Sequence, residues 1–225
     1  MLVKYWMTKD VITIQDEDSM QNALDLLENH NIHMLPVMND VDIVGVVTDR
    51  DLKRAKAAIA NAMNTYDLKK VQSEIKVKSF MSTPPITVHR NASIEETAEK
   101  LIENKISGVP VVDDSGILEG VITKTDLFKV LISLTGLKKR GIQFALIVKD
   151  IPGSIREISE IIRKYGGRMA CILTSYDRAP KGSRRVYIRM YGIDRFKIGR
   201  LEDELRKKAK LLYMVDHKEA VREIY

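Results

Sequence analysis

Two segments of the chain place a hydroxyl and a carboxylate three residues apart at the end of an apolar run. The first is Gly45-Val46-Val47-Thr48-Asp49-Arg50-Asp51, and the second is Gly120-Val121-Ile122-Thr123-Lys124-Thr125-Asp126. Thr and Asp at this spacing form a capping box that satisfies the free N–H groups of a helix start. At such a turn, the same two groups also suit a ribose diol, and the N–H groups suit a phosphate. Each segment therefore predicts a helix start and favours a nucleotide-binding turn.

The residues around each Thr and Asp pair recur at the same spacing, so the strands and helices that position the pair are predicted to occur twice. The chain therefore contains a duplicated unit. The spacing is constant until one extra residue enters the second copy near Ser115-Gly116, in a turn that tolerates an insertion. Each copy is predicted to run strand, helix, strand, strand, helix. Corresponding pairs are Met7 and Met81, Thr13 and Thr87, Ser19 and Ser93, Ile32 and Ile106, and Pro36 and Pro110.

Hydrophobic periodicity and capping residues predict the bounds of these elements. In the first copy they are a strand over 11–14, a helix from Ser19 to His30, strands over 34–38 and 43–47, and a helix from Asp51 to about Asn64. In the second copy they are a helix from a capping box at Ser93 and Glu96 to Asn104, strands over 109–112 and 118–122, and a helix over 124–133.

The two copies resemble a tandem pair of CBS domains, regulatory modules that typically bind adenosine-containing ligands between paired repeats. The first repeat with its crossover would cover 1–74 and the second 75–137. The resemblance implies that Asp51 and Asp126 hold the ribose, with Thr48 and Thr123 beside them. The further ligand positions that it implies are Val11, Ile12, Ile32, His33, Met34, Pro36, Arg50, Ile86, Ile106, Ser107, Gly108, Pro110 and Lys124.

A different unit is predicted over 142–225, after a basic linker at 138–141. Its order is βαββαβ, a ferredoxin-like sheet with helices on one side, so the whole chain is of the α+β class. The expected elements are strands over 142–149, 168–176, 184–191 and 210–215, helices over 154–165 and 194–208, and a last helical turn over 217–225.

The turn Asp150-Ile151-Pro152-Gly153 between the first strand and helix of this unit is similar to that of ACT domains, small regulatory modules that often bind amino acids at dimer interfaces. The resemblance implies that Asp150, Pro152 and Gly153 contact a ligand. The alternative for Gly153 is simply a tight turn, which glycine favours without any ligand. A CBS pair followed by such a unit resembles the AcuB family of acetoin-utilisation accessory proteins.

Composition and missing motifs narrow the classes of function that the sequence favours. The 37 basic and 31 acidic residues, with a net charge of +6, indicate a mixed surface, so nucleic acid is not the expected partner. Cys171 is the sole cysteine, and Met1–Trp6 lacks a signal-peptide core, so we expect a soluble cytoplasmic protein. The sequence offers no nucleophile–base set, Walker loop or metal-ligand spacing, so no catalytic residue, catalytic cofactor or metal is predicted.

The sequence therefore predicts a non-catalytic regulatory sensor of AMP, ADP, ATP or S-adenosylmethionine that forms homodimers and acts on a partner protein. Amino-acid sensing and dimerisation stay open as roles for the C-terminal unit. The alternative is an RNA-binding sheet, because an Arg/Tyr stripe alternates onto one strand face. That stripe would otherwise pack against a second subunit or face solvent. It consists of Arg185, Tyr187, Arg189 and Tyr191.

Overall fold

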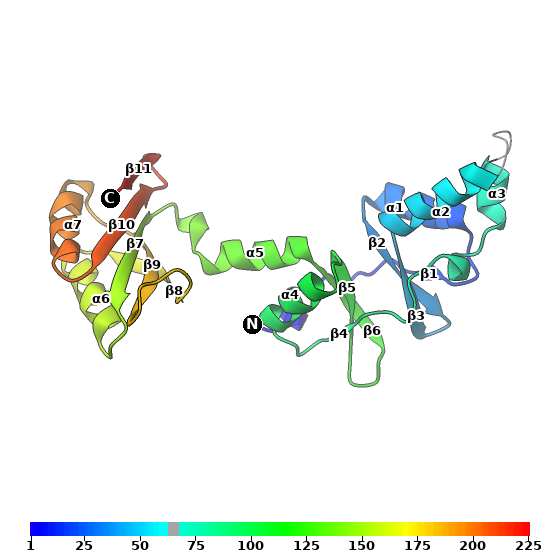
Figure 1. Cartoon of the computed structure of the whole chain (residues 1–225), viewed down its shortest axis with the longest axis horizontal. Coiled ribbons are helices and arrows are strands. Elements are labelled where there is room, and N and C mark those ends of the chain that lie inside the picture. Colours follow the sequence, from blue (N-terminus) through cyan, green and yellow to red (C-terminus); the bar gives the residue numbers. More distant parts are fainter. Residues whose placement is uncertain (63–67) are drawn as a thin grey trace. The chain divides into compact units, whose positions relative to one another are not determined.

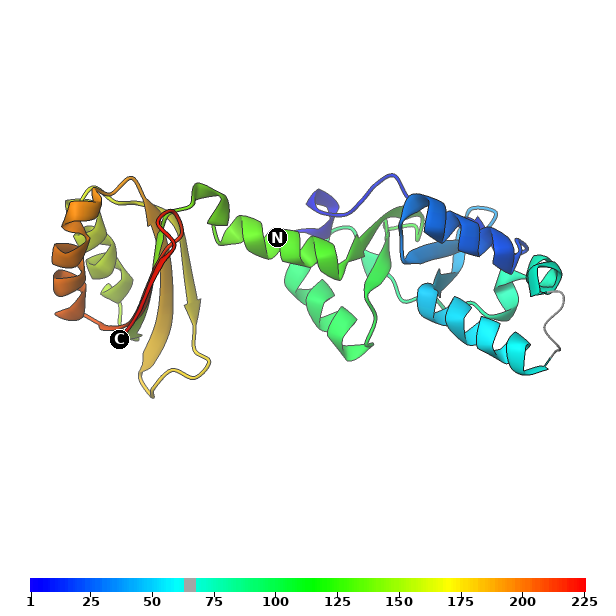
Figure 2. The ribbon, with the colours of Figure 1, turned by 90° about the horizontal axis from the view of Figure 1, so that it is seen from above.

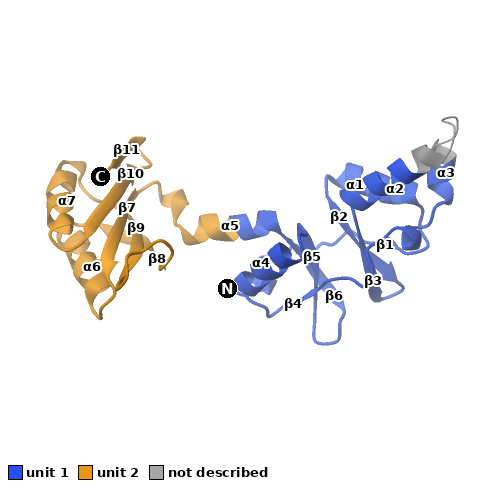
Figure 3. Cartoon of the chain, viewed as in Figure 1, with its two compact units in different colours: residues 1–128 blue, residues 129–225 orange. Residues whose placement is uncertain are grey.

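The structure, a computed structural model, describes residues 1–62 and 68–225. Its contacts divide the chain into two compact units, 1–128 and 129–225 (Figure 3). The division falls inside helix α5 (Lys124–Leu134), so this one helix contributes to both units. It lies before the linker at 138–141, whose role as the domain boundary stays a prediction.

In the first unit, the duplicated sequence forms two copies of one arrangement, each with a three-stranded sheet (Figure 1). In each sheet the first strand is parallel to the second, and the second is antiparallel to the third. The first copy contains η1 (Val3–Tyr5), β1 (Ile14–Gln15), α1 (Met20–His30), β2 (Met34–Asn39), β3 (Asp42–Thr48), α2 (Asp49–Ala62) and α3 (Leu68–Glu74). The second contains η2 (Val77–Ser79), β4 (Val88–His89), α4 (Ile94–Glu103), β5 (Gly108–Val112), β6 (Leu118–Thr123) and α5.

Local capping signals fix the first helix of each copy as predicted. The Ser19 hydroxyl accepts a hydrogen bond from the Asn22 N–H, and Ser93 forms a reciprocal capping box with Glu96. The strand predicted over 11–14 is wrong in its bounds, because pairing with β2 begins only at Ile14. The predicted end of α2 at Asn64 lies outside the described residues.

The two copies exchange their lead-in segments. The Thr8 N–H donates to the Val121 carbonyl on β6, and the Ser82 N–H donates to the Val46 carbonyl on β3, each at 2.9 Å. The lead-in of each copy therefore extends the sheet of the other copy. Thr48 and Thr123 end the two strands that receive these segments, so the lead-in of one copy supports the turn of the other.

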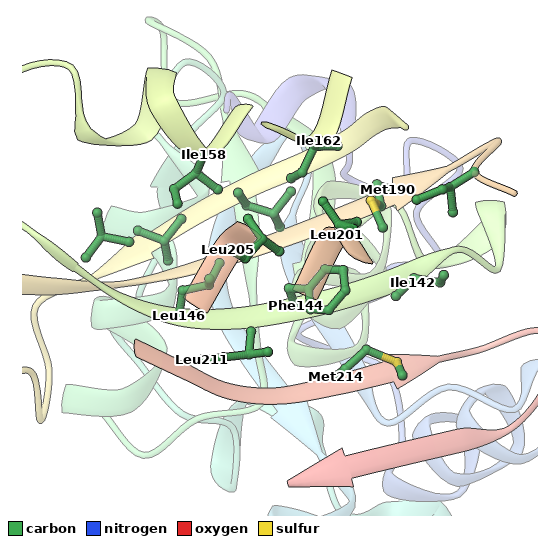
Figure 4. Close-up of a cluster of buried hydrophobic side chains, with 14 residues drawn as sticks. Ile142, Phe144, Leu146, Ile158, Ile162, Met190, Leu201, Leu205, Leu211 and Met214 are labelled. Atoms are coloured by element: carbon green, nitrogen blue, oxygen red, sulfur yellow. The ribbon is translucent and has the colours of Figure 1, made fainter. Parts of the chain in front are cut away.

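The second unit is a five-stranded antiparallel sheet in the order β11-β10-β7-β9-β8, with α6 and α7 on one face (Figure 2). Along the chain, β7, α6, β8, β9, α7 and β10 follow one another in the predicted βαββαβ order of a ferredoxin-like fold. Apolar side chains of β7 and β9 pack against α6 and α7 (Figure 4). The elements are η3 (Leu137–Lys139), β7 (Ile142–Lys149), α6 (Ser154–Lys164), β8 (Arg168–Ser175), β9 (Ser183–Tyr191), η4 (Arg195–Lys197), α7 (Ile198–Arg206), β10 (Lys210–Asp216) and β11 (Val221–Ile224).

The helical turn predicted over 217–225 is wrong, since this segment returns as strand β11 beside β10. Asp216 explains the reversal, because its carboxylate accepts hydrogen bonds from the N–H groups of Lys218 and Glu219. Ala220 then takes a positive φ of 56°, which turns the chain back on itself. The buried carboxylate thus closes a hairpin.

Candidate functional site

Both Thr-x-x-Asp turns form the predicted capping box. Asp51 Oδ2 accepts hydrogen bonds from the Thr48 N–H at 3.0 Å and the Thr48 hydroxyl at 2.6 Å, and the Asp51 N–H donates back to that hydroxyl at 3.4 Å. The corresponding distances between Thr123 and Asp126 are 3.0, 2.7 and 3.4 Å. The two carboxylic residues are only 5% and 6% exposed. One oxygen of each carboxylate therefore fixes the helix start.

The second oxygen of Asp51 faces groups that the sequence analysis missed. Asp51 Oδ1 lies 2.8 Å from Arg54 Nη2 and accepts a 3.5 Å hydrogen bond from the Ser82 hydroxyl. The Arg54 side chain is 73% exposed and that of Asp51 is 6% exposed, so Arg54 is the solvent-facing partner of a buried carboxylate. The position of Arg54 one helical turn after Asp51 is a usable sequence signal. Ser82 belongs to the other copy, 31 residues away, so no short-range sequence pattern predicts its contact with Asp51.

Sheet register brings the other predicted ligand positions to the same end of each sheet. Met34 pairs with Thr48 across β2 and β3, and Gly108 pairs with Thr123 across β5 and β6. Because β1 and β4 run parallel to β2 and β5, the residues just before them lie beside the starts of those strands. The first group comprises Val11, Ile12, Ile32, His33, Met34, Thr48, Arg50 and Asp51. The second comprises Ile86, Ile106, Ser107, Gly108, Thr123, Lys124 and Asp126.

Two of the predicted apolar positions are less accessible than the other apolar ones. Pro36 and Pro110 are buried, whereas Ile32 and Ile106 are half-buried. Each proline pairs with a strand residue whose outer side the exchanged lead-in covers, as Val46 shows by bridging to Ser82. The prolines therefore lie inside the sheet packing in this structure.

Two hollows lie beside other residues of the first unit. One, of about 210 Å³, is lined by Lys4, Tyr5, Met7, Lys9 and Arg90. The other, of about 410 Å³, follows α4 and is lined by Glu96, Glu99 and Glu103 among others. Neither lining includes a ligand position predicted from the sequence.

The Asp150 turn joins β7 to α6 and carries a partner that the sequence analysis missed. Arg184 Nε lies 3.5 Å from Asp150 Oδ1, and Arg184 Nη2 donates to the Ser154 hydroxyl at 3.4 Å. Gly153 has a φ of +87°, and no atom lies within 4 Å of the place for its Cβ. Backbone conformation therefore explains this glycine, and Pro152 beside it is exposed.

The Arg/Tyr stripe lies on the face of β9 opposite the helices, but it is not uniformly open. Arg189 is 5% exposed and donates from Nε to the Thr135 carbonyl and from Nη2 to Gln143 Oε1, both at 2.6 Å. The Lys139 ammonium lies over the Tyr191 ring, 5.4 Å from its centre. Residues of the segment after α5 therefore contact two of the four side chains that were proposed to bind RNA.

Among the described residues, a reactive thiol, a metal site or a membrane-spanning helix would each indicate a further function. Burial raises the pKa of the Cys171 thiol above its usual value, which disfavours the reactive thiolate. No three His, Cys, Asp or Glu side chains are placed to hold a metal ion within residues 1–62 and 68–225. In the same part of the chain, no helix has the length and apolar character needed to cross a membrane.

Comparison with known proteins relates the first unit to one family. The CBS domain family matches residues 3–58 and 77–133, together about half of the chain. A CBS domain-containing protein of Dictyostelium discoideum is 36% identical over 135 residues, covering 59% of this chain and 92% of that protein. The inosine-5'-monophosphate dehydrogenase of Korarchaeum cryptofilum is 34% identical over 120 residues, 53% of this chain but 22% of the enzyme. The chain thus spans about a fifth of the dehydrogenase's length.

Two solved structures are similar to the first unit, and the first of them has a similar fold. The CBS-domain-containing protein of Agrobacterium tumefaciens is 25% identical, with 59% of this chain and all of that chain covered and a TM-score of 0.51. A CBS domain pair in complex with 5-methylthioadenosine and S-adenosyl-L-methionine is 30% identical, with 58% and 95% covered and a TM-score of 0.49. The family match over both repeats and the relative that is matched over 92% of its length show that the chain belongs to the CBS-domain family.

Proposed function

We propose that the chain is a non-catalytic regulatory sensor that binds an adenosine-containing ligand in its CBS pair. The observation that carries this proposal is the duplicated turn, in which a buried carboxylate and a hydroxyl meet apolar residues at one end of a sheet. A carboxylate beside a hydroxyl suits a ribose diol, and apolar side chains suit an adenine ring. The ligand class is AMP, ADP, ATP or S-adenosylmethionine.

The similarity to enzymes does not argue for catalysis. The dehydrogenase match covers about a fifth of that enzyme, whereas the Dictyostelium protein is matched over nearly its whole length. The shared part is therefore the CBS region. A regulatory protein of this kind acts through a partner protein, and the CBS pair would report ligand occupancy to it.

A thermal-shift screen of the full chain tests this function. Adenosine, AMP, ATP and S-adenosylmethionine are compared with guanosine and GMP at equal concentrations. A ligand that binds only the folded state stabilises it by about 2.7 kcal/mol at a hundred times its Kd, so the adenosine compounds should raise the Tm. Millimolar adenosine compounds that leave the Tm unchanged would contradict the proposal.

We further propose that residues 142–225 are an ACT-like domain and that the chain has the AcuB arrangement. The ferredoxin-like strand order and the Asp150 turn support this assignment. Asp150 and Arg184 would bind the ammonium and carboxylate of an amino acid, because their 3.5 Å ion pair leaves Arg184 Nε without a hydrogen bond within the described residues. Dimerisation is the alternative role of this domain. Calorimetry with the twenty amino acids distinguishes the two roles.

Homodimer formation belongs to the same proposal. Helix α5 carries exposed apolar side chains at positions 128, 131, 132 and 134, which recur at helical spacing. Exposed apolar groups that share a helix face commonly mark a protein interface. A second copy of the chain is the occupant that we propose.

A further inference from the structure

The two Thr-x-x-Asp turns differ at one position by a reversal of charge. Thr48 is followed by Asp49, whereas Thr123 is followed by Lys124. Each of these residues is the first residue of its helix. The first turn of α2 therefore carries two carboxylates and the guanidinium of Arg50, and the first turn of α5 carries one carboxylate and an ammonium group.

Lys124 is itself a predicted ligand position, and Asp49 lies beside another, His33. The Lys124 N–H donates to the Ser107 carbonyl at 2.9 Å, and the Asp49 N–H donates to the His33 carbonyl at 3.4 Å. The Asp49 carboxylate also reaches His33, with Oδ2 2.6 Å from Nδ1. Position 49 and position 124 are thus equivalent places at the mouth of the two turns.

We propose that the two sites select ligands by charge, the second copy taking a phosphate-bearing nucleotide and the first copy an adenosine compound without a phosphate. This inference rests on the proposed function and names the ligand of each site. An N-terminal helix turn favours an anion, and a neighbouring ammonium group strengthens that preference. A carboxylate in the same place opposes a phosphate through like-charge repulsion.

Neighbouring cations do not cancel this difference. Arg54 and Lys129 stand at equivalent positions in the two copies, so they contribute the same sign of charge. Arg50 is an additional cation of the first copy, and Arg50 and Lys124 are both exposed, so water screens the two charges alike. Because Asp49 and Asp51 outnumber Arg50 in the first turn, the mouth of the first copy remains the less favourable place for a phosphate.

Calorimetry of the full chain with AMP and with adenosine tests the inference. The variant Asp126→Asn weakens the second site, so the first site is measured alone. The variant Asp51→Asn weakens the first site, so the second is measured alone. We expect the affinity ratio of AMP to adenosine to be at least about tenfold higher for the second site, a difference of about 1.4 kcal/mol. The exchange Asp49→Lys should raise the ratio of the first site, and Lys124→Asp should lower that of the second.

The charge exchanges are also informative without the Asn variants, because positions 49 and 124 are accessible and the capping boxes stay intact. Asp42→Lys is the matched control, since it makes the same change of charge at the opposite end of β3. Equal ratios at both sites, or exchanges that act no more than the control, would overturn the charge selection alone. Binding of neither AMP nor adenosine to the unaltered chain would overturn the proposed function with it.

Discussion

The sulfur of Met81 lies 2.6 Å from the place that a Cβ atom on Gly45 would occupy. The same relationship holds between Met7 and Gly120, at 2.7 Å. Each methionine belongs to the lead-in of one copy, and each glycine stands three residues before the Thr of the other copy's turn. The position of each proposed ligand site therefore depends on a contact made by the other repeat.

Gly120→Ala should destabilise the first unit. The added Cβ would meet the Thr8 carbonyl oxygen at 2.9 Å as well as Met7, and a backbone atom moves less easily than a methionine. Overpacking of this kind costs about 1–3 kcal/mol, measured as a loss of unfolding free energy in urea. Gly199→Ala is the control, because no atom lies within 4 Å of its Cβ position. Unchanged stability of Gly120→Ala would contradict the described contact.

Leu131→Glu should convert the proposed dimer to a monomer. Leu131 lies in the apolar face of α5 that is exposed in the single chain. In the proposed dimer this face would be buried, and burying the Glu carboxylate there would be unfavourable. Light scattering at micromolar concentration gives the mass directly. Ser133→Glu is the matched control on the same helix and should leave the dimer intact. A monomeric mass for the unaltered chain would refute the proposed interface.

Ligand binding in the CBS pair should change hydrogen exchange in residues 135–141. Thr135 directly follows α5, and Arg189 holds its carbonyl at 2.6 Å, so movement of the helix end would reach the sheet of the second unit. Coupling between such sites amounts to about 1–3 kcal/mol. Arg189→Ala should abolish the AMP-dependent change. Arg185→Ala, which removes a hydrogen bond to the Arg178 carbonyl instead, should preserve it. Identical exchange with and without AMP would show that the units are uncoupled.

Acidification should destabilise the second unit through His217. Burial lowers the pKa of His217, the charges of Arg189 and Arg222 lower it further, and Asp216 opposes them. The folded state therefore favours neutral His217, so its contribution is present above the unfolded pKa of about 6.5 and is lost as the pH falls through the lower folded pKa.

Urea unfolding at pH 7.5 and 5.5 measures this effect. The unaltered chain should lose more stability between the two values than His217→Gln does, because the variant has no imidazole to protonate at this position. His30→Gln, at the exposed end of α1, serves as the control and should behave like the unaltered chain. Equal pH dependence in all three proteins would exclude His217 as the cause.

Sequence reasoning succeeded where the determining contacts are local. Ser19 and Ser93 start their helices through hydrogen bonds three residues away, and the strand register follows from short hairpins. Non-local contacts escaped it. Ser82 reaches Asp51 across 31 residues, and Arg189 reaches Thr135 across 54, so neither partner has a periodic or capping signal. The final strand was missed because Asp216 closes its hairpin by side-chain hydrogen bonds.

Calorimetric titration of AMP and adenosine into Asp51→Ala, Asp126→Ala and the double variant tests the central claim most directly. Circular dichroism first establishes that each variant is folded, since both carboxylates also cap helices, and Asp42→Ala serves as the exposed control. Loss of a charged acceptor from the ribose should cost about 1.5–3 kcal/mol, so each site should weaken by about ten- to a hundredfold. A folded double variant that binds both ligands as tightly as the unaltered chain would contradict the assignment of these carboxylates to the ribose.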